Sequence, residues 1–153
     1  MHSCRTPTHR PSTGFHAAGS AALPDVLTTL AGKGFNLVRS LFILNGPPYG
    51  TEHSYNGLRL AGSVAKRDGE EVRIFLMGDA VGCALQGQVV PDGYYRLDRM
   101  LGSAIRRGAE VGCCGTCMDA RAVDDSQLVE GARRSTLDEL TDWTLWADKV
   151  ITF

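Results

Sequence analysis

The chain has 153 residues, of which 43% are hydrophobic and 22% charged, a composition typical of one globular domain with a buried core. Its formal net charge of -1 at pH 7 gives no reason to expect a nucleic acid or an anionic membrane as a partner. No apolar run approaches the roughly 20 residues that a membrane-spanning helix needs.

Residues 1–34 mix Pro, Gly, Ser, Thr and His without a sustained period, and we predict that they form a flexible N-terminal extension. We interpret Cys4 and the histidines of this segment as scattered residues rather than a metal site. The segment contains no continuous apolar stretch, so no Sec-type signal peptide is expected. The predicted domain therefore comprises residues 35–153.

Apolar and β-branched segments predict the strands of this domain. The first is followed by Asn45-Gly46-Pro47 and the next two directly by glycine, where each strand is expected to stop. The last ends the chain. The predicted strands are residues 35–44, 72–77, 109–114 and 149–153.

Helical periodicity separates these strands. Residues 97–105 are the clearest helix, because apolar side chains recur at i, i+3, i+4, i+7 and i+8 and Gly108 follows as a stop. Thr51 is the expected cap of an earlier helix and Ser135 the start of the final one, which runs to about Ala147. Short helices are expected near residues 80–88 and 128–132.

The alternation of strands and helices predicts an α/β fold with a mainly parallel sheet and helices on both faces. In such sheets, ligand sites lie outside the carboxyl ends of the strands. Three loops leave such ends, at residues 45–50, 78–83 and 113–121. If their strands are neighbours, Cys83 and Cys114 lie on adjacent loops, with Asp79 and Tyr49 close by.

The first of these loops, Gly46–Thr51, joins a strand to a helix start, as phosphate-binding loops do. It lacks the Lys of G-x-x-x-x-G-K-[ST] and does not match G-x-G-x-x-G. We therefore interpret it as a rigid backbone corner that shapes a thiol pocket, with nucleotide binding as the alternative.

The cysteines carry most of the functional signal. There are five of them, three within residues 113–117, which does not fit a secreted disulfide scaffold and favours a reducing, cytoplasmic location. Cys114 and Cys117 form a C-x-x-C motif, which suits a redox pair, half of a zinc site, or a nucleophile that accepts and passes on sulfur. A thioredoxin fold would place several strands after the motif, where we predict one, and no further zinc-ligand motif follows.

The clustered thiols are expected to differ. Successive side chains of a strand face opposite ways, so Cys113 is expected to pack inertly while Cys114 has different surroundings. Cys114 precedes Gly115 and a helix start, where N–H groups and nearby cations can stabilise a thiolate. For Cys83, the packed and the functional interpretations stay open.

Other polar residues are less informative. Arg121 either stabilises a thiolate or an anion, or forms a surface ion pair with Asp119 or Asp124. His53 is expected to be an exposed histidine at a helix start rather than a proton donor. The two tryptophans are expected to be core or subunit-interface anchors.

Three segments resemble the DsrE/DsrF-like family, which includes sulfur-relay subunits of the TusBCD type. They are Asn45-Gly46-Pro47-Pro48-Tyr49-Gly50-Thr51, Gly78-Asp79-Ala80-Val81 and Cys114-Gly115-Thr116-Cys117-Met118-Asp119-Ala120-Arg121, and the ending Ala147–Phe153 is similar to the family's last strand. The resemblance covers Phe35 to Phe153. Ala122, where many relatives have Gly, and the extra thiol of Cys113 depart from the family pattern.

The resemblance implies a flavodoxin-like three-layer α/β sandwich that assembles as a homotrimer, a homohexamer or a related hetero-oligomer, and a homo-oligomer is the expectation for this chain. It implies cytoplasmic sulfur metabolism with no organic cofactor, and sulfur donor and acceptor proteins as partners. The sulfur-carrying cysteine of the family corresponds to Cys114, whereas the role of the position matched by Cys117 is open.

The leading hypothesis is a sulfur carrier or sulfurtransferase in which Cys114 holds sulfur as a persulfide. Cys117, with Cys83 as a second candidate, would resolve the persulfide or guard the site. One alternative is a dithiol redox protein that uses Cys114 and Cys117. The other is a non-catalytic, oligomeric module that binds a small ligand and whose cysteines only pack.

Overall fold

The computed structural model describes residues 37–153, so the predicted N-terminal extension, residues 1–34, lies outside the described residues. Five strands form one parallel sheet in the order β4-β3-β2-β1-β5. The strands are β1 (Val38–Leu44), β2 (Glu70–Leu76), β3 (Glu110–Cys114), β4 (Ala132–Ser135) and β5 (Lys149–Thr152). The helices are α2 (His53–Val64), η1 (Gly78–Ala84), α3 (Leu97–Ile105), α4 (Gly115–Asp119), η2 (Asp125–Gln127) and α5 (Leu137–Trp146).

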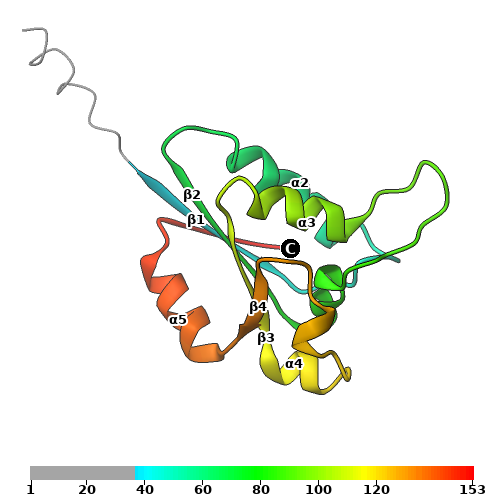
Figure 1. Cartoon of the computed structure of the whole chain (residues 1–153). Coiled ribbons are helices and arrows are strands. Elements are labelled where there is room, and N and C mark those ends of the chain that lie inside the picture. The colour runs from blue at the N-terminus through cyan, green and yellow to red at the C-terminus, as the bar shows by residue number, and fades with distance from the viewer. Residues whose placement is uncertain (1–36) are drawn as a thin grey trace, which may run out of the picture. The chain divides into compact units, whose positions relative to one another are not determined.

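The order of the strands explains why the helices divide between two faces. From β1 to β4 the chain advances across the sheet in one direction, and the last connection then returns to the far side of β1. Because parallel crossovers are right-handed, this reversal sends α5 to the face opposite α2 and α3. Figure 1 shows α2 and α3 together on one side of the sheet and α5 on the other. The predicted three-layer α/β class is therefore confirmed.

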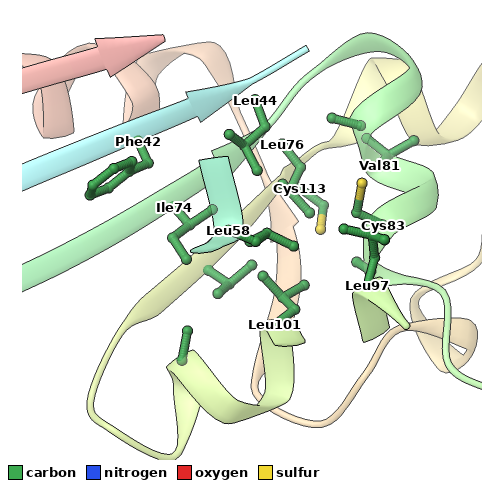
Figure 2. Close-up of a cluster of buried hydrophobic side chains, with 14 of the residues drawn as sticks. Phe42, Leu44, Leu58, Ile74, Leu76, Val81, Cys83, Leu97, Leu101 and Cys113 are labelled. Atoms are coloured by element: carbon green, nitrogen blue, oxygen red, sulfur yellow. The ribbon is translucent and has the colours of Figure 1, made fainter. Parts of the chain in front are cut away.

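The larger core lies between the sheet and the pair α2 and α3. Alternate residues of the strands point into it, among them Phe42, Ile74 and Val111, and they meet Leu58 of α2 and Leu101 of α3. Figure 2 shows part of this core, with the sulfurs of Cys83 and Cys113 among the apolar side chains. The period-two alternation explains why residues adjacent to these on the same strands belong to the other face.

The smaller core lies under α5. Leu41 and Phe75 point from the sheet toward Leu140 and Trp143 of α5, and the rings of Phe75 and Trp143 meet edge to face, 5.9 Å between centroids. This packing fixes α5 over β1 and β2.

The segment before α5 departs from the prediction. A short helix was expected near residues 128–132, but Gly131 turns the chain with φ 88° and Ala132–Ser135 form strand β4 at the edge of the sheet. The sequence Ala-Arg-Arg-Ser has little intrinsic preference for a strand, so its pairing with β3 decides its structure. Two strands therefore follow the C-x-x-C motif, not one.

Two helix starts also differ in detail. Ser135 is the last residue of β4, and Thr136 is the residue that caps α5, accepting a hydrogen bond from the backbone N–H of Glu139 at 3.2 Å. Helix α2 begins at His53 after Glu52, so Thr51 does not cap it. The predicted segment 80–88 contributes only the 3₁₀ helix η1.

Candidate functional site

The carboxyl ends of β2 and β3 bring two of the predicted loops together. Arg121, just after α4, donates to Asp79 of η1, with 2.7 Å between guanidinium nitrogen and carboxylate oxygen. The backbone N–H of Gly78 donates to the sulfur of Cys117. Gly78 has φ 53°, a backbone conformation that favours glycine, so this residue type suits the turn that aims the N–H group. The predicted adjacency of these two loops is confirmed.

Cys114 lies at the point where β3 becomes α4. It is the last residue of the strand and the N-cap position of the helix, and its side chain is half-buried. The thiol of Cys117 donates to its sulfur, with 2.6 Å between the two sulfur atoms. The Thr116 hydroxyl lies 3.3 Å from the same sulfur, and the backbone N–H groups of Thr116 and Cys117 also donate to it. The sulfur of Cys114 is therefore surrounded by hydrogen-bond donors.

These donors set the acidity of Cys114. Partial burial acts to raise the pKa of its thiol, because burial disfavours a charged sulfur. The hydrogen bonds from Cys117 and Thr116 favour the thiolate and outweigh that effect, so the pKa of Cys114 lies below its ordinary value. The thiolate expected at this position is supported by local backbone and side-chain donors.

Cys117 has the opposite acidity. Partial burial and the proton that it donates to Cys114 raise its pKa, while the Gly78 N–H and the nearby charge of Arg121 act weakly in the other direction. The charge of Arg121 therefore acts on Cys117, whereas the sequence predicted a cation beside Cys114. The Arg121 guanidinium also donates to the carbonyl oxygen of Cys117 at 3.0 Å. The pair consists of one ionisable thiol and one thiol that keeps its proton.

A cavity of about 660 Å³ opens beside the two thiols. Its walls come from the ends of β2, β3 and β4 and from the starts of α4 and α5. They comprise Phe75, Met77, Cys114, Gly115, Thr116, Cys117, Asp119, Arg134, Ser135, Thr136 and Leu137. Cys114 pairs with Ser135 in the sheet register, which explains why the start of α5 reaches the site.

Arg134 holds one wall of the cavity in place. Its guanidinium donates to Asp119 at 2.8 Å, to Asp125 at 2.9 Å and to the carbonyl oxygen of Gly115 at 3.1 Å. A Cβ at Gly115 would lie 3.1 Å from the carbonyl oxygen of Ser135 and 3.2 Å from Arg134. A small residue directly after Cys114 therefore lets β4 approach this cysteine closely.

The other two thiols of the described segment are buried. Cys113 points into the larger core, and burial raises its pKa to about 12. Cys83 is also fully buried, and burial raises its pKa to about 11. The structure thus agrees with inert packing for Cys113 and favours the packed interpretation of Cys83.

The loop at residues 45–51 lies away from the cavity, because none of its residues lines the walls. It braces η1 instead. Pro48 packs against Gly82, and the Ser54 hydroxyl donates to the carbonyl oxygen of Gly46 at 2.6 Å. The expectation that this loop shapes the thiol pocket is therefore wrong. The loop follows β1, which is separated from β3 by β2, whereas the pocket opens on the other side of β3, toward β4.

Several residues of the site had no clear signal in the sequence. Arg134 and Leu137 reach the cavity only because β4 pairs with β3, and that strand was not predicted. Arg121 pairs with Asp79, not with Asp119 or Asp124 as considered above. His53 is exposed at the start of α2, as expected.

Two further geometric findings concern the described segment as a whole. Within residues 37–153, no three His, Cys, Asp or Glu side chains come together in an arrangement that could hold a metal ion. No helix of these residues has the length and the apolar composition needed to span a membrane.

Comparison with known proteins finds relatives that this chain matches over nearly their whole length. The model of the DsrE/DsrF-like family matches residues 39–153. Protein YchN of Escherichia coli is 40% identical over 114 residues, which cover 74% of this chain and 97% of YchN, and an uncharacterized protein of Methanopyrus kandleri is 38% identical over 111 residues, covering 72% and 90%. The crystal structure of the Escherichia coli protein has a TM-score of 0.72 and covers 76% of this chain and 99% of that one.

Proposed function

The chain belongs to the DsrE/DsrF-like family, and from this premise we propose that it is a sulfur carrier that binds sulfur as a persulfide on Cys114. The observation that supports this most directly is the environment of the Cys114 sulfur. It is half-buried beside a cavity, accepts hydrogen bonds from Cys117 and Thr116, and has a lowered pKa. A thiol whose pKa is lowered is ionised more often than an ordinary thiol at the same pH, and the thiolate is the nucleophilic form.

The chemistry needs no oxidant. The Cys114 thiolate attacks the terminal sulfur of a donor R–S–SH, forming the Cys114 S–S bond and breaking the S–S bond of the donor. The leaving thiolate R–S⁻ takes the electron pair, and Cys117, which holds its proton, can supply that proton. An acceptor thiolate then attacks the terminal sulfur of Cys114–S–SH and releases Cys114 as a thiolate. We propose sulfur donor and acceptor proteins in the cytoplasm as the protein's partners.

We propose that Cys117 also resolves the persulfide. As a thiolate it can attack the inner sulfur of Cys114–S–SH, which forms a Cys114–Cys117 disulfide and releases HS⁻. The 2.6 Å between the two sulfurs supports this role for Cys117. Cys83, which is sealed in the core, does not support the same role.

The experiment measures the intact mass of the reduced protein after incubation with a small organic persulfide. We expect an adduct of about 32 Da, the mass of one sulfur atom, and its loss in Cys114→Ser. Cys117→Ser is the matched control and should accumulate more adduct, because the resolving step is absent. An adduct that forms equally on Cys114→Ser, or on no variant, would refute the proposal.

A dithiol redox function is the second candidate, favoured by the contact between the two sulfurs and by their opposite pKa shifts. It predicts that the protein equilibrates between dithiol and disulfide in a glutathione redox buffer, with both thiols protected from alkylation together. Sulfur transfer without such an equilibrium favours the persulfide carrier.

We also propose that the protein forms a homotrimer or homohexamer. Leu145 of α5 is 81% exposed and Val150 of β5 is 45% exposed. In the described residues, β5 ends the sheet with an unpaired edge. Exposed apolar side chains beside an open strand edge are typical of a surface that another copy covers.

A further inference from the structure

The walls of the cavity beside Cys114 show what kind of group fits it. Phe75 and Met77 from the end of β2 form one side, and Leu137 at the start of α5 forms the opposite rim. Phe75 is buried at 1% exposure, whereas Leu137 is 69% exposed, so the cavity runs from the core to the surface. Its volume of about 660 Å³ is in the range of pockets that hold small molecules.

The charges of the cavity are already neutralised. Apart from the Cys114 thiolate itself, the ionised side chains among the residues that line it are Asp119 and Arg134, and these two form an ion pair at 2.8 Å. The guanidinium of Arg134 has a second carboxylate partner in Asp125, so its charge is more than balanced. An anionic group that entered this cavity would lose water without gaining a free cation, which is unfavourable.

Resting on the proposed function, we infer that the cavity binds the organic group of a small, uncharged and apolar persulfide or thiol. Phe75, Met77 and Leu137 contact that group, and this contact places the terminal sulfur of R–S–SH at Cys114. The transfer is R–S–SH + Cys114–S⁻ → R–S⁻ + Cys114–S–SH, in which one S–S bond forms and one breaks. The leaving thiolate is then protonated by the Cys117 thiol.

The test uses methanethiosulfonates, R–S–SO₂CH₃, because they vary R while the leaving group stays the same. The Cys114 thiolate forms Cys114–S–S–R and expels methanesulfinate, CH₃SO₂⁻. The full-length protein carries Cys117→Ser, so that the mixed disulfide is not resolved. Three reagents are compared, with R as benzyl, sulfonatoethyl and trimethylammonioethyl, and fragmentation mass spectrometry measures the rate at Cys114.

Each rate is divided by the rate of the same reagent on a small free-thiol peptide. After this correction we expect benzyl to react about tenfold faster than the anionic reagent, since burying part of an apolar ring is favourable and burying an anion without a free cation is not. Equal corrected rates, or a faster anionic or cationic reagent, would overturn the inference.

Two leucine variants show where the benzyl group binds. Leu137→Ala removes part of the rim and should reduce the benzyl preference several-fold. Leu60→Ala is the control, because Leu60 is an exposed leucine of α2 and lies on the other side of the sheet. It should leave the preference unchanged. A preference that survives Leu137→Ala would place the benzyl group elsewhere and contradict the assignment.

The competing occupant is a second copy of the chain. Light scattering on Leu137→Ala tests for it, since a lowered mass together with an unchanged reagent preference would assign the cavity to a subunit contact and overturn the inference. The proposed function fails separately. If Cys114 prefers the benzyl reagent but takes up no sulfur, the carrier role is contradicted and the assignment of the pocket is supported. If Cys114 takes up sulfur but shows no reagent preference, the carrier role is supported and the assignment of the pocket is contradicted.

Discussion

Cys114 and Cys117 have identical side chains, yet their neighbours give them opposite acidities. The pKa of Cys114 is lowered by donors that favour its thiolate, and that of Cys117 is raised by burial and by the proton that it shares with Cys114. A three-residue separation at the start of α4 suffices to create this difference. In a persulfide relay the division is useful, because nucleophile and proton donor are then separate groups.

The donor role of Cys117 can be measured at Cys114. Cys117→Ala removes a hydrogen bond that favours the thiolate, so the pKa of Cys114 rises and its alkylation by iodoacetamide should need a higher pH. Near neutral pH the rate should fall several-fold. Cys117→Ser retains a hydroxyl donor and should show a smaller shift. A pH profile that stays in place in Cys117→Ala would mean that the other donors alone hold the thiolate.

At the scale of elements, α5 links the site to the smaller core. Its first residue, Leu137, lies at the cavity rim, and the helix packs on the face of the sheet opposite α2 and α3. The guanidinium of Arg73, from β2, lies 3.9 Å from the ring centroid of Trp146 and 5.2 Å from that of Trp143. Such cation–π contacts stabilise partly buried arginines. Together with the Phe75 contact, they fix α5, and with it the position of Leu137 at the cavity rim.

The first turn of α5 is also tied to β4 by charge. Glu139 accepts hydrogen bonds from Arg133 at 2.6 Å and from the Ser135 hydroxyl at 2.5 Å, and the Arg133 guanidinium is the main cause that lowers the pKa of Glu139 to about 2. A lowered folded-state pKa means that the ionised form stabilises the fold. This contribution is complete above the unfolded-state pKa of about 4.5 and is lost as the pH falls toward 2.

We therefore expect Glu139→Gln to lower the free energy of unfolding by about 2 kcal/mol at pH 6 and by much less at pH 2. Urea unfolding at a series of pH values measures this. Asp138→Asn, in the same turn, is the control and should leave the pH dependence nearly unchanged. If Glu139→Gln and the parent protein lose stability in parallel as the pH falls, the ion pair between Glu139 and Arg133 is not the source of the pH dependence.

At the scale of the whole molecule, the described sheet has unequal faces. The helices α2 and α3 cover one face, whereas α5 covers part of the other and leaves Leu145 and Val150 exposed near β5. An open parallel edge and exposed apolar side chains favour self-association. The predicted trimer or hexamer would cover this surface.

This assembly can be tested by light scattering at micromolar concentration. The parent protein should have the mass of three or six chains, and Leu145→Glu should reduce it, because a charge would be buried at the contact. Leu60→Glu, at an exposed leucine of α2, should keep the parent mass. A monomeric parent protein contradicts the proposal directly, and an assembled Leu145→Glu would place the contact elsewhere.

The sequence by itself determined the α/β class and singled out Cys114 as the candidate nucleophile. Apolar runs that end at glycine mark buried strands, and Cys114 at such an end, followed by Gly115, needed no tertiary information to be singled out. Only the tertiary structure decided that Ala132–Ser135 is a strand, because its pairing with β3 overrides a weak local preference. That one strand brings Arg134 and Leu137 to the thiols, moves the pocket away from the loop at residues 45–51, and sets its apolar character. Contacts between residues distant in sequence depend on strand order, which no local pattern specifies.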